Sequence, residues 1–339
     1  MIPLRILFSF LLPVTVSLHA QTDLRAYDYR RADSIARHCK KQAGEKYTQL
    51  AHRLTDALPT QQEKFRAIYR WVAENLEYSE GNYTKDPGQL LKKGKTVCIG
   101  YATLLKDMCD EVGLECELIT GYARNEASDV RKRMKKLELH AWNAIRLDGR
   151  WHLVDATWSS GDFDAKTKKY TPGFDPVWFL GPPEFFIRTH FPNEKKWQLL
   201  NKKISAWRFL HRPVCYTGFE TARITSITAN RARLCWLRIP LKLTYRQAPG
   251  ARTDSIGGAL EPTATFYAPT AKRKRNGAIK VKIPLYKPGT YSFYFFVNGK
   301  AVASYRVRAF GIDPDEQQER RNKRAKKREQ RWAKRAKKK

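Results

Sequence analysis

Apolar residues recur every three or four positions in the first third of the chain, and this spacing predicts helices. The helical pattern covers residues 23–75, where Thr60 and Glu63 have the spacing of a capping box that begins a second helix. A further helix is predicted to start at Cys98 and to end at Gly113, because glycine is favoured just after a helix. This part of the chain is therefore expected to be mainly helical.

The period of the pattern then falls to two, which is typical of strands. Residues 115–122 predict one strand, and Asp148-Gly149 favours a tight hairpin turn between two more. Residues 201–222 are interpreted as a linker, and residues 223–311 have the short alternating segments and turns of an immunoglobulin-like β-sandwich. The predicted fold class is α+β, with a mixed domain that has a helical lead-in over residues 21–200 and a β-sandwich after the linker.

The first twenty residues predict export. Arg5 precedes an apolar run that ends at Leu18, and the small residue Ala20 follows, as in a cleaved signal peptide over residues 1–20. The run is shorter than the roughly 20 residues of a membrane-spanning helix, so an uncleaved anchor is the weaker alternative. The mature protein is expected in the periplasm, at the cell surface or in the medium.

Positive charge is concentrated at the C-terminal end of the chain. There are 65 Lys and Arg residues against 33 Asp and Glu, a net charge of +32, and residues 320–339 hold thirteen basic side chains against one acidic one. Because like charges repel, residues 312–339 are predicted to be a disordered basic tail. Export argues against nucleic acid as a partner, so the tail is expected to meet an anionic cell-surface polymer or lipid head groups.

Six cysteines in an exported chain suggest disulfide bonds. If one thiol is reserved for catalysis, the odd remainder cannot pair completely within the chain, so some thiols are expected to be free. The six are Cys39, Cys98, Cys109, Cys116, Cys215 and Cys235.

The hairpin at Asp148-Gly149 predicts that a histidine and an aspartate lie close together. A two-residue turn fixes the register of the two strands, and continued outward this register sets Trp142 opposite Asp155. Two positions further out, His140 faces Thr157. His140 and Asp155 are then diagonal neighbours on one face of the sheet, within reach of a hydrogen bond that fixes the imidazole tautomer.

Cys98 lies at a predicted helix start, where the positive end of the helix dipole favours a thiolate. A thiolate beside an imidazole that a carboxylate orients can attack an amide carbonyl and form a thioester. Taken singly, each residue has a simpler interpretation. Cys98 can be a buried small side chain, His140 a structural histidine and Asp155 the end of a strand. Their combination predicts a catalytic Cys-His-Asp triad.

The segments that carry these three residues resemble the core motifs of the transglutaminase-like superfamily: residues 96–102 (TVCIGYA), 139–144 (LHAWNA) and 151–158 (WHLVDATW). Residues 64–72 and 184–200 are similar to its kyphoscoliosis-peptidase-like branch. The resemblance implies a papain-like core in which Cys98 is the nucleophile and His140 the general acid and base. It also implies that Asp155 orients His140.

Further site residues are suggested around this triad. The Cys98 amide is the natural first oxyanion donor, and Gln89 upstream of it is the candidate for the second, with a solvated loop residue as the alternative. Trp142 and Trp158 are candidates for the walls of a substrate groove, with core packing as the alternative. The sequence has no phosphate-binding glycine loop and no closely spaced metal-ligand motif, so no cofactor and no metal are predicted.

The resemblance specifies the fold more narrowly than the reaction, because the superfamily includes cross-linking transglutaminases, proteases, amidases and inactive members. The predicted function is thiol-dependent amide hydrolysis, or acyl transfer, on peptides or proteins. Hydrolysis is favoured because nothing in the sequence specifies an amine-acceptor site. The alternative is a non-catalytic binding scaffold held at the cell surface, and no pattern predicts the oligomeric state.

Overall fold

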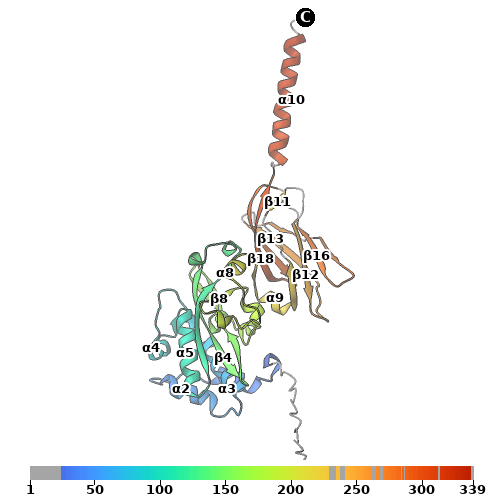
Figure 1. Ribbon diagram of the computed structural model, residues 1–339. Helices are drawn as coiled ribbons and strands as arrows, with labels where there is room; N and C mark the ends of the chain where they lie inside the picture. Colours follow the sequence, from blue (N-terminus) through green and yellow to red (C-terminus); the bar gives the residue numbers. More distant parts are fainter. Residues whose placement is uncertain are drawn as a thin grey trace, which may run out of the picture.

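The computed structural model describes residues 24–336, apart from residues 229–233, 237–240, 262–264, 268–269, 284, 286 and 312–313. Figure 1 shows a domain of helices and strands, then a β-sandwich, then a long C-terminal helix. The predicted signal peptide over residues 1–20 lies outside the described residues. Within the described part of the chain, no helix is both long enough and apolar enough to cross a membrane.

Five helices precede the main sheet in the described part of the chain; four lie where the apolar spacing predicts helix, and the fourth in chain order, α4, lies between the predicted segments. They are α1 (Arg30–His38), α2 (Tyr47–Thr55), α3 (Gln61–Asn75), α4 (Pro87–Lys93) and α5 (Cys98–Glu111). The Thr60 hydroxyl accepts a hydrogen bond from the Glu63 amide at 3.2 Å, which confirms the predicted cap of α3. The predicted helix start at Cys98 is confirmed, and Gly113, with φ +73°, lies just beyond the end of α5.

The main sheet is antiparallel and has the strand order β5-β4-β3-β8. Its strands are β3 (Cys116–Ala123), β4 (Glu138–Leu147), β5 (Arg150–Val154) and β8 (His190–Pro192). The turn at Asp148-Gly149 pairs Leu147 with Arg150, and the predicted register holds as far as the pair Asn143 and Val154.

The predicted register is wrong beyond Val154, because β5 ends there. Asp155 is instead the N-cap of the short helix α6 (Ala156–Ser160), and its side chain accepts a hydrogen bond from the Trp158 amide at 3.0 Å. Thr157 therefore lies in a helix and does not face His140 across the sheet. An aspartate that can cap a helix ended the strand three residues earlier than Thr157, the last residue that the alternation paired.

The remaining elements of the first domain are short. They are the strands β1 (Glu77–Tyr78), β2 (Lys95–Thr96), β6 (Gly161–Asp164) and β7 (Lys169–Pro172), the helix α7 (Pro183–Phe186), and the 3-10 turns η1 (Leu24–Ala26), η2 (Ala127–Asp129), η3 (Met134–Lys136), η4 (Pro176–Trp178) and η5 (Lys195–Gln198). The parallel pair of β1 and β2 sets Tyr78 opposite Thr96, two residues before Cys98.

The predicted β-sandwich is confirmed, with two sheets that pack face to face. One has the order β10-β12-β16-β15 and the other β11-β18-β17-β13-β14. Alternating residues of both sheets, such as Val281 and Phe295, are fully buried between them. The strands are β10 (Ile224–Thr228), β11 (Leu234–Trp236), β12 (Leu241–Gln247), β13 (Ile256–Glu261), β14 (Thr265–Tyr267), β15 (Thr270–Arg273), β16 (Ile279–Ile283), β17 (Gly289–Val297) and β18 (Lys300–Phe310).

The predicted linker over residues 201–222 is folded and joins the two domains closely. It contains α8 (Ala206–Leu210), β9 (Val214–Cys215) and α9 (Thr217–Thr221), and β9 pairs with β18 of the sandwich. The Phe219 ring stacks on Phe185 of the first domain, with 6.4 Å between the ring centroids. The apolar side chains of this segment are needed for burial, so it does not serve as a free connector.

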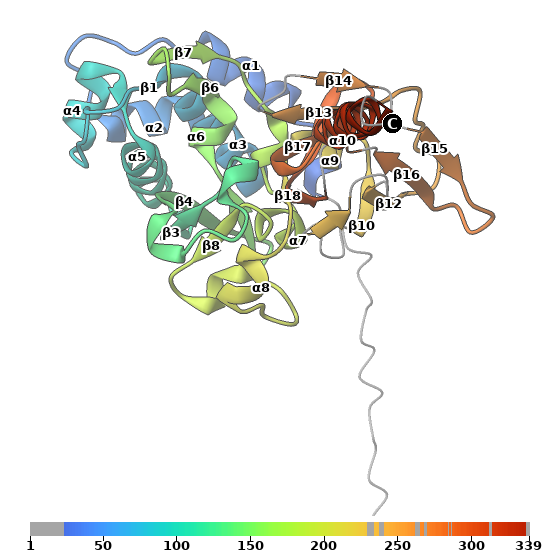
Figure 2. The same cartoon turned by 90° about the horizontal axis from the view of Figure 1, so that it is seen from above.

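The C-terminal tail forms the helix α10 (Pro314–Ala336), so the prediction of disorder is wrong. Glu316 pairs with Arg320, and Glu319 with Lys323, each one helical turn apart. Such pairs, together with good helix formers, offset the repulsion among the basic side chains. Figures 1 and 2 show α10 projecting from the sandwich, and Figure 2 views it end-on.

The structure confirms that thiols remain free. Cys39, Cys98, Cys109, Cys116 and Cys215 form no disulfide bond, and the Cys235 side chain lies outside what the structure describes.

Candidate active site

Asp155 is fully buried and is held by hydrogen bonds to residues of α3, α6 and η4. Its backbone amide donates to the Trp178 carbonyl at 3.1 Å, and its own carbonyl accepts from the Tyr69 hydroxyl at 3.0 Å. Its Oδ1 accepts the capping hydrogen bond from the Trp158 amide. These bonds leave Oδ2 fixed in one direction, toward β4.

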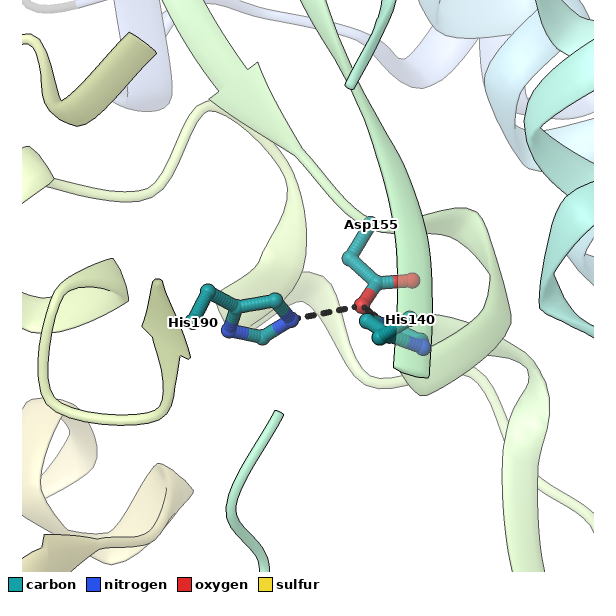
Figure 3. Close-up of side chains that lie close together, drawn as sticks. All are labelled: His140, Asp155 and His190. Atoms are coloured by element: carbon teal, nitrogen blue, oxygen red, sulfur yellow. Dashed lines mark hydrogen bonds and ion pairs between the residues drawn. The ribbon is translucent and has the colours of Figure 1, made fainter. Parts of the chain in front are cut away.

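His140 lies on β4 with its Nε2 2.7 Å from Oδ2 of Asp155, as Figure 3 shows. The predicted contact between the two side chains is therefore present, although the strand pairing that predicted it is not. Burial alone would lower the pKa of His140, but the charge and hydrogen bond of Asp155, with the contact to Cys98, raise it to about 10. Burial alone would raise the pKa of Asp155, but His140 and His190 hold it well below its usual range. The pair is accordingly an imidazolium and a carboxylate near neutral pH.

Cys98 is the first residue of α5 and is partly buried. Its side chain lies beside His140 and helps to raise the pKa of that ring. Because Nε2 of His140 binds Asp155, Nδ1 is the ring nitrogen left for the sulfur. The structure thus brings together all three predicted triad residues, in the order thiol, imidazole, carboxylate.

His190 is a site residue that the sequence analysis missed. Its Nε2 lies 2.9 Å from the same Oδ2 atom of Asp155, and its Nδ1 lies 2.8 Å from the Thr189 hydroxyl. Burial lowers the pKa of His190 to about 4, despite the opposing effect of Asp155. The one available signal was its place in the segment similar to the kyphoscoliosis-peptidase-like branch, which does not indicate a role.

The two predicted tryptophans have different environments. Trp142 is 1% exposed and stacks beneath His140, with centroids 6.0 Å apart. It does not line the cavity described below, so its assignment to a groove wall is wrong, because β4 turns it into the core. Trp158 does line that cavity and contacts His140, with 5.4 Å between ring centroids.

A cavity of about 470 Å³ opens beside the His140 ring. Tyr78, Glu138 and Trp158 line it from the first domain. Residues 214–217 close another side, so the segment predicted to be a linker forms part of the wall. The cavity is large enough for one or two amino-acid side chains and reaches the imidazole that would transfer protons.

Gln89 is not brought to this cavity. Asp86 caps α4 by accepting a hydrogen bond from the Gln89 amide at 2.7 Å, and this holds the Gln89 side chain in an exposed first turn. Tyr78 lines the cavity beside the start of α5 instead, and its hydroxyl has no hydrogen-bond partner among the described residues. Burial, together with the charges of Glu138 and Cys98, raises the pKa of Tyr78, which keeps its hydroxyl able to donate.

In the described part of the chain, one group of residues has donor atoms spaced closely enough to bind a metal ion. It consists of His140, Asp155 and His190. The donor atoms of these residues lie within 4.8 Å of one another. Their proximity is already accounted for by the two hydrogen bonds to Asp155. The absence of a metal stays a prediction.

Comparison with known proteins agrees with this geometry. Residues 48–156 match the model of the transglutaminase-like superfamily. The chain is 36% identical to kyphoscoliosis peptidase of Mus musculus, over 70% of this chain and 36% of that protein. For kyphoscoliosis peptidase of Homo sapiens the identity is 38%, over 71% and 37%. The chain therefore spans about a third of the length of these curated relatives.

Solved structures show weaker likeness. Red sea bream transglutaminase is 11% identical, with a TM-score of 0.24 over 78% of this chain and 55% of that one. A structure described as a TGase is 18% identical, with a TM-score of 0.26 over 42% and 35%. The α+β fold class is confirmed by the helices and sheets of the described residues, and the transglutaminase-like core by the family match over residues 48–156. Residues 48–156 thus match the transglutaminase-like superfamily, and the chain is similar to the kyphoscoliosis-peptidase branch of it.

Proposed function

We propose that this protein is a thiol-dependent hydrolase or acyl transferase that acts on amide bonds of peptides or proteins. The observation that carries the proposal is the hydrogen bond from His140 to Asp155, with Cys98 beside the same imidazole and a cavity that His140 lines. The relatives from Mus musculus and Homo sapiens are named as peptidases, which supports the same class of chemistry. Export and attachment of the basic tail to an anionic surface are part of the proposal and rest on the sequence alone.

The reaction follows from the proton positions. The Cys98 thiolate attacks the substrate carbonyl carbon, and the carbonyl oxygen becomes an oxyanion that the Cys98 amide and the Tyr78 hydroxyl stabilise. The imidazolium of His140 gives its Nδ1 proton to the leaving amine as the C–N bond breaks, which leaves a thioester. Neutral His140 then takes a proton from water or an acceptor amine, and this nucleophile displaces the thiol. Hydrolysis is our preferred outcome, because no acceptor amine site is evident at the described residues.

The proposal is tested by alkylating Cys98 with iodoacetamide across pH and reading each cysteine by peptide mass spectrometry. In the wild type, Cys98 is expected to label fast well below the ordinary thiol pKa of about 8.5, because the imidazolium stabilises the thiolate. In His140→Ala this low-pH labelling should disappear. Cys39 is the internal control, since it is also partly buried and burial raises its pKa. An ordinary titration of Cys98 that His140→Ala leaves unchanged would favour the non-catalytic scaffold.

Replacing Tyr78 by Phe is expected to slow acyl transfer by about 100-fold, the usual loss for one oxyanion donor. The measurement is release of nitrophenolate from p-nitrophenyl acetate. Alkylation of Cys98 should stay at the wild-type rate, because it forms no oxyanion. Tyr83→Phe is the matched control, since Tyr83 is 67% exposed. Equal ester hydrolysis by the two variants would remove Tyr78 from the mechanism.

A further inference from the structure

His190 and His140 bind the same oxygen of Asp155 from two sides. The distances from Oδ2 are 2.7 Å to Nε2 of His140 and 2.9 Å to Nε2 of His190, and Figure 3 shows the two rings on either side of the carboxylate. With the Trp158 amide on Oδ1, both oxygens of Asp155 have directed donors. The carboxylate therefore cannot rotate without losing a bond to one of three elements.

The hydrogen bonds of His190 define its proton. An ionised carboxylate only accepts, so Nε2 of His190 must carry the proton that it donates to Asp155. In the neutral ring, Nδ1 then accepts from the Thr189 hydroxyl at 2.8 Å, which is shorter than the 3.3 Å from that hydroxyl to its other acceptor, the Phe186 carbonyl. Thr189 is itself 1% exposed, so water does not compete for this bond. The bond to Asp155 thus selects the Nε2–H tautomer, and the Thr189 hydroxyl complements it.

Aromatic rings enclose His190 and fix its orientation. The ring centroids of Trp158, Trp142 and Phe186 lie 4.5, 5.0 and 5.0 Å from its own, and Trp178 lies at 5.4 Å. The side chain is 1% exposed. An apolar enclosure disfavours a charged ring, so His190 is a neutral and permanent donor.

We propose that His190 is a positioning residue, which donates a fixed hydrogen bond to Asp155 and thereby holds the carboxylate ionised and aimed at His140. The inference rests on the proposed function, because it assigns His190 a role in the same site. His190 is not itself placed to touch a substrate at the thiol. The titratable groups that face Asp155 are His140 on β4, His190 on β8 and Tyr69 on α3, with Glu138 further away.

The first test is the pH profile of Cys98 alkylation in His190→Phe and His190→Gln. Phe keeps the apolar contacts but donates nothing, so protonation of Asp155 should begin at higher pH. The acid limb of the profile is expected to move up by about one pH unit. Gln retains an amide donor and should restore most of the wild-type profile. His152→Phe, on β5 and outside the site, is the matched control and should change nothing.

The outcomes separate the two hypotheses. Wild-type alkylation at low pH with an unchanged acid limb in His190→Phe would overturn the role of His190 and leave the proposed function intact. An ordinary titration of Cys98 in the wild type would overturn both. A second test needs no variant: ¹⁵N NMR of the wild-type histidines at pH 7 should show His190 as the neutral Nε2–H tautomer. A charged ring, or the Nδ1–H tautomer, would also overturn the proposal.

Discussion

Replacing Asp155 by Ala is expected to lower the free energy of unfolding by about 3–5 kcal/mol and to abolish the low-pH reactivity of Cys98. The loss is large because the change removes one partner of a fully buried ion pair and leaves His140 without its counter-charge. The donors of His190 and of the Trp158 amide also lose their acceptor. The measurements are urea denaturation and the alkylation profile of Cys98.

The size of this loss should depend on pH in a definite direction. The folded-state pKa of Asp155 is lowered, so its share of the stability is present above the unfolded value of about 3.9 and is lost as pH falls through the folded value. The folded-state pKa of His140 is raised to about 10. Its contribution to the stability is therefore fully present below the unfolded pKa of about 6.5, and it is lost as the pH rises from there to about 10. The difference between wild type and Asp155→Ala should therefore shrink steadily from pH 6.5 to pH 10.

Two further variants make the Asp155 experiment specific. Asp155→Asn keeps the volume and one acceptor oxygen, so it should lose less stability than Asp155→Ala while still losing the charge that supports the imidazolium. Asp162→Ala removes an exposed carboxylate that lines the same cavity, and it should change stability by less than about 0.5 kcal/mol. Equal effects of Asp162→Ala and Asp155→Ala would contradict the buried ion pair.

The parts of the site that local chemistry controls could be predicted from the sequence. A two-residue turn at Asp148-Gly149 fixes the hairpin register, and a helix start at Cys98 places a thiol at the positive end of α5. Asp155 was predicted to meet His140 across a regular strand pair. It meets His140 as a helix cap instead, because capping by Asp155 competes with continued strand pairing. The contact survives because both geometries place the two side chains on the same side of the sheet.

The parts that depend on distant contacts could not be predicted. His190 follows Asp155 by 35 residues and lies on β8, a strand of three residues that is too short to show alternation. Its position depends on the pairing of β8 with β3, which no local pattern specifies. The wall that residues 214–217 contribute to the cavity has the same origin, since β9 is held by β18 from the end of the sandwich.

The approach of β8 to β3 requires a glycine at position 121. Gly121 lies opposite Pro192 of β8 and His140 of β4. A Cβ atom there would lie 2.2 Å from the Phe191 carbonyl oxygen and 2.8 Å from Cη2 of Trp142. The first of these is a backbone atom of β8, so it cannot rotate away as a side chain can. The strand that carries His190 must therefore move as a whole to admit a methyl group.

Gly121→Ala is accordingly expected to cost about 3 kcal/mol of unfolding free energy, at the upper end for an overpacked core, because backbone must shift. It should also lengthen the bond from His190 to Asp155 and move the acid limb of Cys98 alkylation upward, as His190→Phe does. Gly257→Ala is the matched control, a strand glycine where the added carbon would meet only Phe296, at the ordinary distance of 3.5 Å. If Gly121→Ala unfolds with the wild-type midpoint and keeps the wild-type pH profile, then the placement of His190 does not depend on this close approach.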